Sequence, residues 1–235
     1  MKKVNLVLQS KGGVGKSLFL WFVAQLEKEN KTVFIDLDES TQTSSARLGI
    51  VVGENRVKHF KILNENKKLE REKILNLFEM ISETKTDKWY IDFGAPESEE
   101  FRRLLEFDIS AKNLSDELKS MGIELQIYVI IAGRDALISC LKYYNSTKDI
   151  LSDAIPYLAL MNEGTFGGLE SIEQSSKALT AANIEFKAFG GLGESESSKD
   201  VIRLITEQKD PNTLNFAGRL TYKKVLEQVQ TILAS

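Results

Sequence analysis

The sequence contains little cysteine, proline or histidine, and it has no long apolar run. Its 235 residues include one cysteine, Cys140, three prolines and one histidine, His59. A lone cysteine forms no internal disulfide and cannot by itself hold zinc or an iron–sulfur cluster, and its apolar neighbours predict a buried, inert thiol. No stretch approaches the roughly 18 apolar residues of a membrane helix. These absences exclude disulfide-stapled small folds, zinc-stabilised folds and helical membrane proteins.

The charge balance is mildly acidic, and the apolar content is enough for a substantial core. Net charge is −3 at pH 7, with 42% hydrophobic and 28% charged residues. No global basic field therefore attracts nucleic acid or acidic lipid, although a local basic patch stays open. The apolar run near the start, 4–8, is too short for a signal peptide and has no small-residue cleavage site. We expect a cytoplasmic protein without integral membrane association.

Apolar runs of strand length alternate with segments of helical period along the chain. The expected strands are 4–8, 33–37, 89–93, 125–132, 157–161 and 185–189, and the expected helices are 16–29, 69–83, 99–107, 136–151, 169–182 and 198–208. Most strands are apolar on both faces, which is typical of a parallel sheet covered by helices. The alternation predicts an α/β fold, a single-domain doubly wound and mostly parallel sheet with helices on both faces, over residues 1–235.

Three further segments are less regular or lie at the end. Residues 59–63 are interpreted as a short edge strand, which places His59 away from every motif and in no catalytic role. Residues 108–121 form a polar helical segment that looks inserted before a strand. The last segment, 222–233, has apolar residues at helical spacing, and its scarcity of basic charge favours a core stripe over a membrane-binding face.

A glycine-rich loop between the first strand and the first helix carries the main functional signal. Gly12, Gly13, Val14 and Gly15 allow the backbone to curl so that successive N–H groups form an anion nest, and the following helix adds its positive N-terminal end. In such a loop Lys16 neutralises the β and γ phosphates, and the neighbouring serine hydroxyl binds magnesium. The alternative, a glycine-rich turn that only caps a helix, requires chance agreement at many fixed positions.

Lys-Gly-Gly-Val-Gly-Lys-Ser, residues 11–17, resembles the deviant Walker A motif of the ParA/MinD family, a family of P-loop ATPases. The resemblance implies binding of ATP/ADP with Mg2+, with Ser17 as a metal ligand. It also implies an ATP-dependent sandwich homodimer in which Lys11 reaches the partner's nucleotide and stabilises developing charge, as an arginine finger does. Many relatives have a second threonine where Leu18 stands, so this nucleotide-binding position supplies no hydroxyl to the α phosphate here.

Acidic residues follow two expected strands, at the edge where open α/β sheets bind ligands. Residues 36–40 resemble the family's switch I segment, which implies that Asp36 holds a magnesium-bound water and that Asp38 orients or deprotonates the attacking water. Asp92 ends an apolar strand in the Walker B manner and is expected to bind magnesium through water. Two alternatives stay open: Asp38 or Ser40 only caps the helix at 41–48, or Asp92 only starts a turn.

Asn162, which follows another expected strand, is a candidate for contact with the adenine edge, because relatives often place asparagine there. The glycine-rich stretch 190–193 lies where relatives cover the base. Both segments are equally compatible with plain turns, given the propensities of Asn and Gly.

The family resemblance also narrows the biological task. A single cysteine excludes the usual reductase branch, and the loop begins too early for a preceding helix-turn-helix domain. What remains resembles short ParA-like ATPases for plasmid partition or stability, with weak ATP hydrolysis stimulated by a partner protein. Such proteins bind DNA non-specifically. The basic candidates for this are Lys58, Lys61, Lys67, Lys68 and Arg71, or Arg203, Arg219, Lys223 and Lys224. Two alternatives are a cargo-positioning ATPase that acts only on proteins and a metabolic ligase similar to dethiobiotin synthetase.

Overall fold

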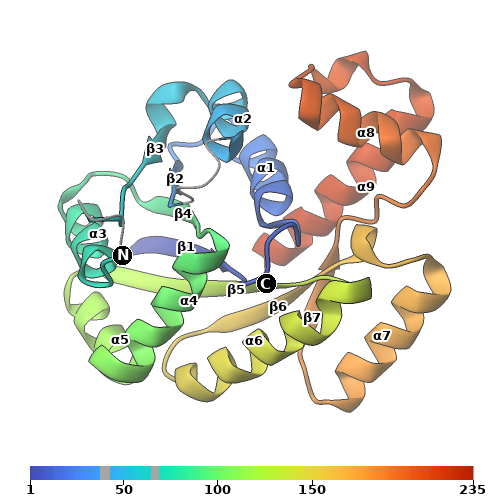
Figure 1. Ribbon diagram of the computed structural model, residues 1–235. Coiled ribbons are helices and arrows are strands. Elements are labelled where there is room, and N and C mark those ends of the chain that lie inside the picture. Colours follow the sequence, from blue (N-terminus) through green and yellow to red (C-terminus); the bar gives the residue numbers. More distant parts are fainter. Residues whose placement is uncertain (38–42, 65–68, 235) are drawn as a thin grey trace.

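One parallel sheet forms the centre of the molecule (Figure 1). The computed structural model describes residues 1–37, 43–64 and 69–234. Within these residues seven strands pair in the order β3-β2-β4-β1-β5-β6-β7. Their bounds are Lys2–Leu8 (β1), Val33–Asp36 (β2), Val57–His59 (β3), Lys88–Asp92 (β4), Ile123–Ile131 (β5), Tyr157–Asn162 (β6) and Phe186–Phe189 (β7). The predicted α/β class and parallel sheet are confirmed.

Helices cover both faces of this sheet. Figure 1 shows α1, α2 and α9 on one side and α3 to α7 on the other, with α8 packed against α9. The helices are Lys16–Leu26 (α1), Thr43–Val52 (α2), Glu72–Glu83 (α3), Ala95–Arg103 (α4), Ala111–Ser120 (α5), Leu137–Leu151 (α6), Leu169–Ala181 (α7), Glu196–Glu207 (α8) and Phe216–Leu233 (α9). The strand order reverses at β1, so a crevice opens beside its carboxyl end, where doubly wound sheets bind ligands.

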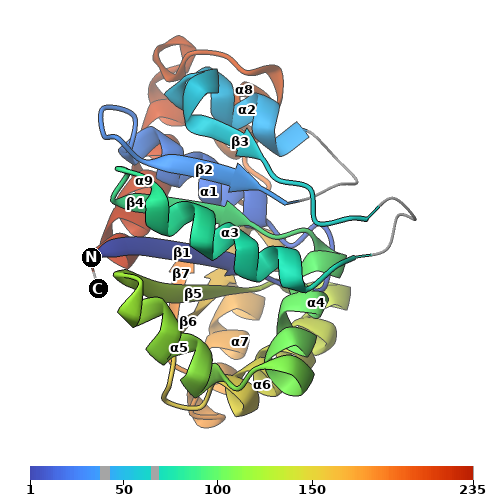
Figure 2. The ribbon, with the colours of Figure 1, turned by 90° about the vertical axis from the view of Figure 1, so that its left-hand side faces the viewer.

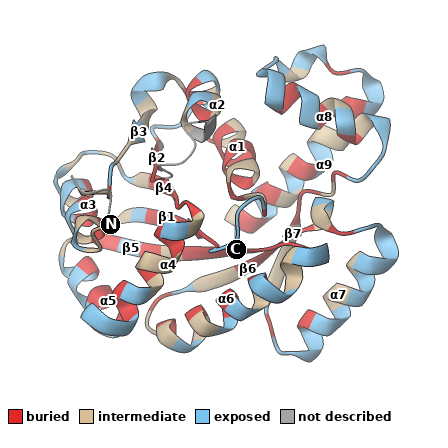
Figure 3. Cartoon of the chain, in the orientation of Figure 1, coloured by how far each residue is buried: buried red, intermediate tan, exposed pale blue. Residues whose placement is uncertain are grey.

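The core lies between the central strands and the helices (Figure 3). In β1 the last five residues are all buried, because helices cover this strand on both faces. Phe19 of α1 packs edge-on against Phe189 of β7, with ring centroids 5.3 Å apart, and also meets Tyr128 of β5. These aromatic contacts hold the first helix, and therefore the loop before it, against the sheet.

Two predicted boundaries were wrong, each for a local reason. The helix expected from Glu99 begins at Ala95, because proline is tolerated in the first turn of a helix and Pro96 lies there. The edge strand expected at 59–63 runs instead over Val57–His59 and pairs with β2, with His59 in register with Asp36. His59 therefore lies beside a predicted site residue, contrary to the expectation that it is remote from every motif.

The expectations for the inserted segment and for the apolar stripe of the last segment are confirmed. Helix α5 lies between α4 and β5, in the segment interpreted as inserted, and Ser110 caps it by accepting a hydrogen bond from the Asn113 amide. The apolar stripe of α9 is core, since Val225 and Val229 are fully buried. Among the helices in the described part of the chain, none is both long and apolar enough to cross a lipid bilayer.

Candidate nucleotide-binding site

Four polar segments meet at the carboxyl edge of the sheet. They are the loop after β1, the end of β2, the end of β4 and the end of β6. All strands run in the same direction, so their carboxyl ends lie at one edge, while the start of β1 and the end of α9 lie at the opposite end (Figure 2). The parallel topology thus gathers predicted site residues that are far apart in sequence.

The loop after β1 has the backbone of a phosphate nest. Gly13 has φ +74° and Gly15 has φ +105°, a left-handed region that side chains with a Cβ adopt only with strain. Space around the loop differs along its length. A Cβ on Gly12 or Gly13 would meet no atom within 4 Å, whereas one on Gly15 would lie 2.2 Å from Nδ2 of Asn162. Gly15 is therefore required by both backbone conformation and packing, and the stretch before it stays open to a ligand.

Lys16 begins α1 and is mostly buried below this loop. Its Nζ donates a hydrogen bond of 3.0 Å to the backbone carbonyl of Gln9. This contact holds the ammonium group beside the nest, next to the positive end of α1, where a phosphate chain gains most from it. Its predicted contact with the β and γ phosphates stays a prediction.

Ser17 and the two strand-end aspartates lie together. The Ser17 hydroxyl donates a hydrogen bond of 2.8 Å to Oδ2 of Asp92, and Asp92 is in register with Asp36 on the adjacent strand β2. Asp36 in turn accepts hydrogen bonds from the backbone amide and the hydroxyl of Ser45 in α2. A hydroxyl and carboxylates beside a phosphate nest suit Mg2+, which keeps several waters and takes few protein ligands. The residues present therefore fit a magnesium ion bound together with phosphates.

Asn162 forms one wall of a cavity that opens from the loop. Its Nδ2 donates a hydrogen bond of 2.8 Å to the Val14 carbonyl, and its buried Oδ1 has no donor among the described residues. The adjacent cavity has a volume of about 270 Å³. A Cβ on Gly190 would lie 2.6 Å from Oδ1, so glycine there keeps this acceptor open. An exocyclic amino group, such as that of adenine, is the kind of donor that this acceptor fits.

The other predicted site residues have different surroundings. Leu18 lines the same cavity with its apolar side chain. Lys11 is exposed and pairs with no carboxylate within the described ranges. Asp38 lies outside the described residues, as do Glu39 and Ser40, so its predicted role in positioning water stays a prediction.

Two supporting residues were not predicted from the sequence. Gln9 is fully buried at the end of β1, where its amide nitrogen donates to Ser98 of α4 and its side chain donates to the Ile130 carbonyl. Thr165 donates to the Asn162 carbonyl and accepts from the Gly133 amide. These contacts fix the loop and the strand ends. Their partners are distant in sequence, so no local pattern could reveal them.

The single cysteine lies below the same loop. Cys140 is fully buried in α6, and burial raises the pKa of its thiol, against smaller opposing effects from the Ala132 backbone and from Lys16 and Lys11. Thiolates, not thiols, are reactive. The predicted burial of the thiol is confirmed.

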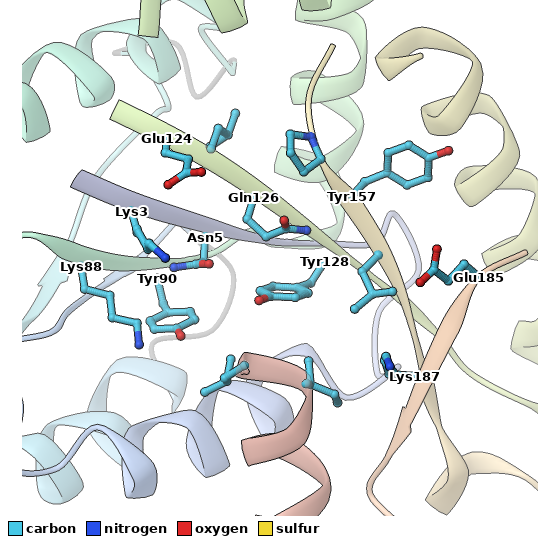
Figure 4. Close-up of a pocket in the computed structure, with 15 residues that line it drawn as sticks. Lys3, Asn5, Lys88, Tyr90, Glu124, Gln126, Tyr128, Tyr157, Glu185 and Lys187 are labelled. Atoms are coloured by element: carbon cyan, nitrogen blue, oxygen red, sulfur yellow. The ribbon is translucent and has the colours of Figure 1, made fainter. Parts of the chain in front are cut away.

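A larger cavity, about 410 Å³, lies at the amino ends of the strands beside the end of α9 (Figure 4). Lys3, Lys187, Glu124 and Glu185 are among its walls, so charges of both signs mix there, and Tyr90 and Tyr128 also face it. It is lined by no glycine-rich loop and by no helix N-terminus among the described residues. Of these two cavities, the smaller one at the carboxyl edge has the features of a phosphate site.

Comparisons with known proteins agree with this geometry. No model of a known protein family matches the sequence. Protein TraL of Escherichia coli is 31% identical over 147 residues, 59% of this chain and 54% of that protein, so the chain spans about half the length of this curated relative. A putative plasmid partition protein from Borrelia burgdorferi B31, solved with AMPPNP, has a TM-score of 0.59 at 17% identity, covering 100% of this chain and 99% of that one. MinD from Aquifex aeolicus has a TM-score of 0.57 at 11% identity, covering 99% and 98%.

The sheet and the loop together define the fold of a P-loop nucleotide-binding protein. More specifically, the chain has the fold shared by plasmid partition proteins of the ParA type and by MinD, as the resemblance over residues 11–17 predicts.

Proposed function

We propose that this protein binds ATP with Mg2+ at the carboxyl edge of its sheet and hydrolyses it. The observation that carries the proposal is the loop itself: two left-handed glycines open a nest at the start of α1, with Lys16 beside it and Ser17 bonded to Asp92. A nest, a buried lysine and a hydroxyl–carboxylate pair in this order suit a magnesium-bound triphosphate.

Each residue has a distinct part in the proposed chemistry. Lys16 exchanges the Gln9 carbonyl for phosphate oxygens, a charge-assisted contact that is stronger than a neutral one. Ser17, Asp92 and Asp36 would hold the magnesium ion, which neutralises charge on the phosphate oxygens when bound. Asn162 orients the base, and Asp38 positions the attacking water. Positioning and charge stabilisation provide most of the catalysis in phosphoryl transfer.

In this proposal Lys11 contacts the nucleotide that is bound to the second subunit of a homodimer. It is exposed at the outer end of the nest and makes no ion pair among the described residues, so its charge is available beyond its own subunit. An ATP-dependent sandwich homodimer would bring it to the partner's phosphates. A lysine delivered in this way stabilises transition-state charge as an arginine finger does.

The proposed task is partition, stability or positioning of plasmid DNA or other cargo, in the cytoplasm and with stimulation by a partner protein. Support comes from the fold shared with a plasmid partition protein and from the similarity to TraL. MinD of this fold has also been solved in a complex with MinC.

A protein-only cargo is the second candidate, and the ion pairs of the basic residues favour it. Arg71 pairs with Asp108 and Glu100, and Arg203 pairs with Asp200, so neither presents free positive charge to a DNA backbone. Lys223 and Lys224 remain exposed, whereas Lys67 and Lys68 lie outside the described residues. Binding of the ATP-loaded protein to duplex DNA, with an affinity that falls steeply as salt rises, would support DNA as the cargo. Absence of ATP-dependent DNA binding at low salt would support protein as the cargo.

The nucleotide site is tested by Lys16→Ala, with Lys3→Ala as the control at the opposite edge of the sheet. Loss of the charged phosphate contact is expected to lower ATP affinity by about 100-fold or more in titration calorimetry. The fold should persist, because the Lys16 side chain points to the loop and not into the apolar core. Unchanged ATP affinity in this variant would contradict the assignment of the loop.

A further inference from the structure

Arg47 of α2 lines the same cavity as Asn162. The first turn of α1 contributes Ser17 and Leu18 to this cavity, α8 contributes Ile202 and other apolar residues, and Arg47 completes the wall. Among the residues known to line the cavity, Arg47 is the only one with a charged side chain. The wall is otherwise made of glycines, apolar side chains and small polar groups.

The guanidinium of Arg47 makes no ion pair with another part of the chain that the structure describes. Within residues 1–37, 43–64 and 69–234, no carboxylate forms an ion pair with it, in contrast to Arg71, Arg102 and Arg203. A half-buried arginine loses part of its hydration, and an anionic ligand would replace it. A cation in the wall of an otherwise uncharged cavity beside a phosphate nest points to a ligand phosphate.

The path of a nucleotide through the cavity identifies that phosphate. With its base at Asn162 and its terminal phosphates in the nest at Lys16, the ligand must run along the first turn of α1 between them. Leu18 lies there and offers no polar side-chain atom. The α-phosphate would thus meet no side-chain donor from α1 at this point, whereas Arg47 of α2 is a cation in the wall of the same cavity.

We propose that Arg47 binds the α-phosphate of the nucleotide and provides the charge that Leu18 does not. This inference rests on the nucleotide-binding function proposed above. Bidentate N–H donation by guanidinium suits two oxygens of one phosphate. Because ATP, ADP and AMP all contain the α-phosphate, Arg47 serves each of them equally and adenosine not at all.

A purely structural role for Arg47 is the competing explanation. Arg47 also borders a neighbouring cavity of about 270 Å³ that is lined by Trp21, Lys28 and Asp210, among others. In that role its charge would help to hold the connection between α8 and α9 against α1 and α2. Lys28 lines this neighbouring cavity but not the nucleotide cavity, so Lys28→Ala is a matched control that removes a cation from the neighbouring cavity alone.

The test compares wild type, Arg47→Ala, Arg47→Lys and Lys28→Ala in the full chain. Titration calorimetry would measure the affinities for ADP and ATP. Competition against a fluorescent ADP would measure the affinities for AMP and adenosine. Arg47→Ala is expected to lower the affinities for ADP, ATP and AMP by a similar factor, about tenfold for a lost charged hydrogen bond. The affinity for adenosine should stay unchanged. Arg47→Lys should recover part of the loss, and Lys28→Ala should bind like wild type.

Three results would overturn the inference: unchanged ADP affinity in Arg47→Ala, a loss confined to ATP, or an equal loss for adenosine. Thermal unfolding of the ligand-free variants shows whether each variant is folded. If Arg47→Ala does not fold, the inference is still tested by the nucleotide affinities of Arg47→Lys. Failure of the proposed function is distinguishable, because wild type itself would then bind no ADP. If Lys16→Ala loses ADP affinity and Arg47→Ala keeps it, the role proposed for Arg47 is contradicted, while the proposed nucleotide site is not.

Discussion

Asn162 and Val14, 148 positions apart in sequence, are joined by a hydrogen bond from the Asn162 Nδ2 to the Val14 carbonyl. The bond links the end of β6 to the loop before α1. The same side chain therefore stabilises the predicted phosphate nest with its nitrogen and offers an acceptor to the predicted base with its oxygen. The proposed recognition of the base and the conformation of the loop therefore both depend on the amide of Asn162.

Gly190→Ala tests this amide, with Gly122→Ala as its control. Both glycines have φ +73°, so alanine adds similar backbone strain at each, but only the Cβ at position 190 collides with Asn162. Gly122→Ala is expected to lower stability by about 1 kcal/mol and to leave ADP affinity unchanged. Gly190→Ala should lose at least as much stability, because its Cβ also collides with Asn162, and should weaken the binding of ADP at least about tenfold. Equal ADP affinities in the two variants would remove Asn162 from the base site.

Asp92→Asn tests the proposed magnesium site. The neutral amide keeps the size of the side chain but loses the charge that holds a magnesium-bound water. We expect ADP binding without magnesium to persist, while the gain in ATP affinity on adding magnesium disappears and hydrolysis falls by about 100-fold or more. Asp87→Asn, an exposed position just before β4, is the control for lost charge. Magnesium-dependent hydrolysis at the wild-type rate in Asp92→Asn would place the metal elsewhere.

Asp38→Ala and Lys11→Ala separate the two proposed parts of hydrolysis. Asp38→Ala should bind ATP, hydrolyse it poorly and accumulate as a dimer, because only the attacking water loses its partner. Lys11→Ala should bind ATP but dimerise weakly, because its contact lies across the interface. Light scattering with ATP and magnesium distinguishes the two, with Lys112→Ala on α5 as an exposed control. A wild-type protein that hydrolyses ATP as a strict monomer would contradict the sandwich model.

Glu27 makes stability depend on pH. Burial raises the pKa of this carboxyl, but hydrogen bonds from Lys88, Thr32 and Asn30 outweigh burial and lower it below its usual value of 4.5. A lowered folded-state pKa stabilises the protein above the unfolded-state pKa, and this contribution is lost as pH falls through the folded-state value.

Glu27→Gln should therefore lower the free energy of unfolding by about 1 kcal/mol at pH 7, with the difference from wild type shrinking as pH falls below 4.5. Denaturant unfolding at several pH values measures this. Glu29→Gln, an exposed neighbour, should change stability little at any pH. A difference between Glu27→Gln and wild type that is constant with pH would show that the ion pair with Lys88 is not its source.

Much of the fold and part of the site could be predicted because their signals are local. Strand and helix periods in the sequence are enough for an α/β sheet, and the loop at 11–17 needs only neighbouring residues to form its nest. Which of the site residues lie next to one another depended instead on the pairing of strands that are distant in sequence. His59 was misplaced because strand β3 begins two residues before the predicted edge strand, and this shift puts it in register with Asp36. The extent of the domain, 1–235, stays a prediction.

The sequence by itself determined the nest, its lysine and the aspartates at the strand ends, because each of these needs only a short segment and the carboxyl end of a parallel strand. Only the tertiary structure decided which side chains meet. The register of β2 with β4 brings Asp36 beside Asp92, and the packing of α2 brings Arg47 to the cavity wall. The return of the chain through β6 places Asn162 under Val14. Such contacts depend on how many elements pack at once, and no local pattern of residues encodes them.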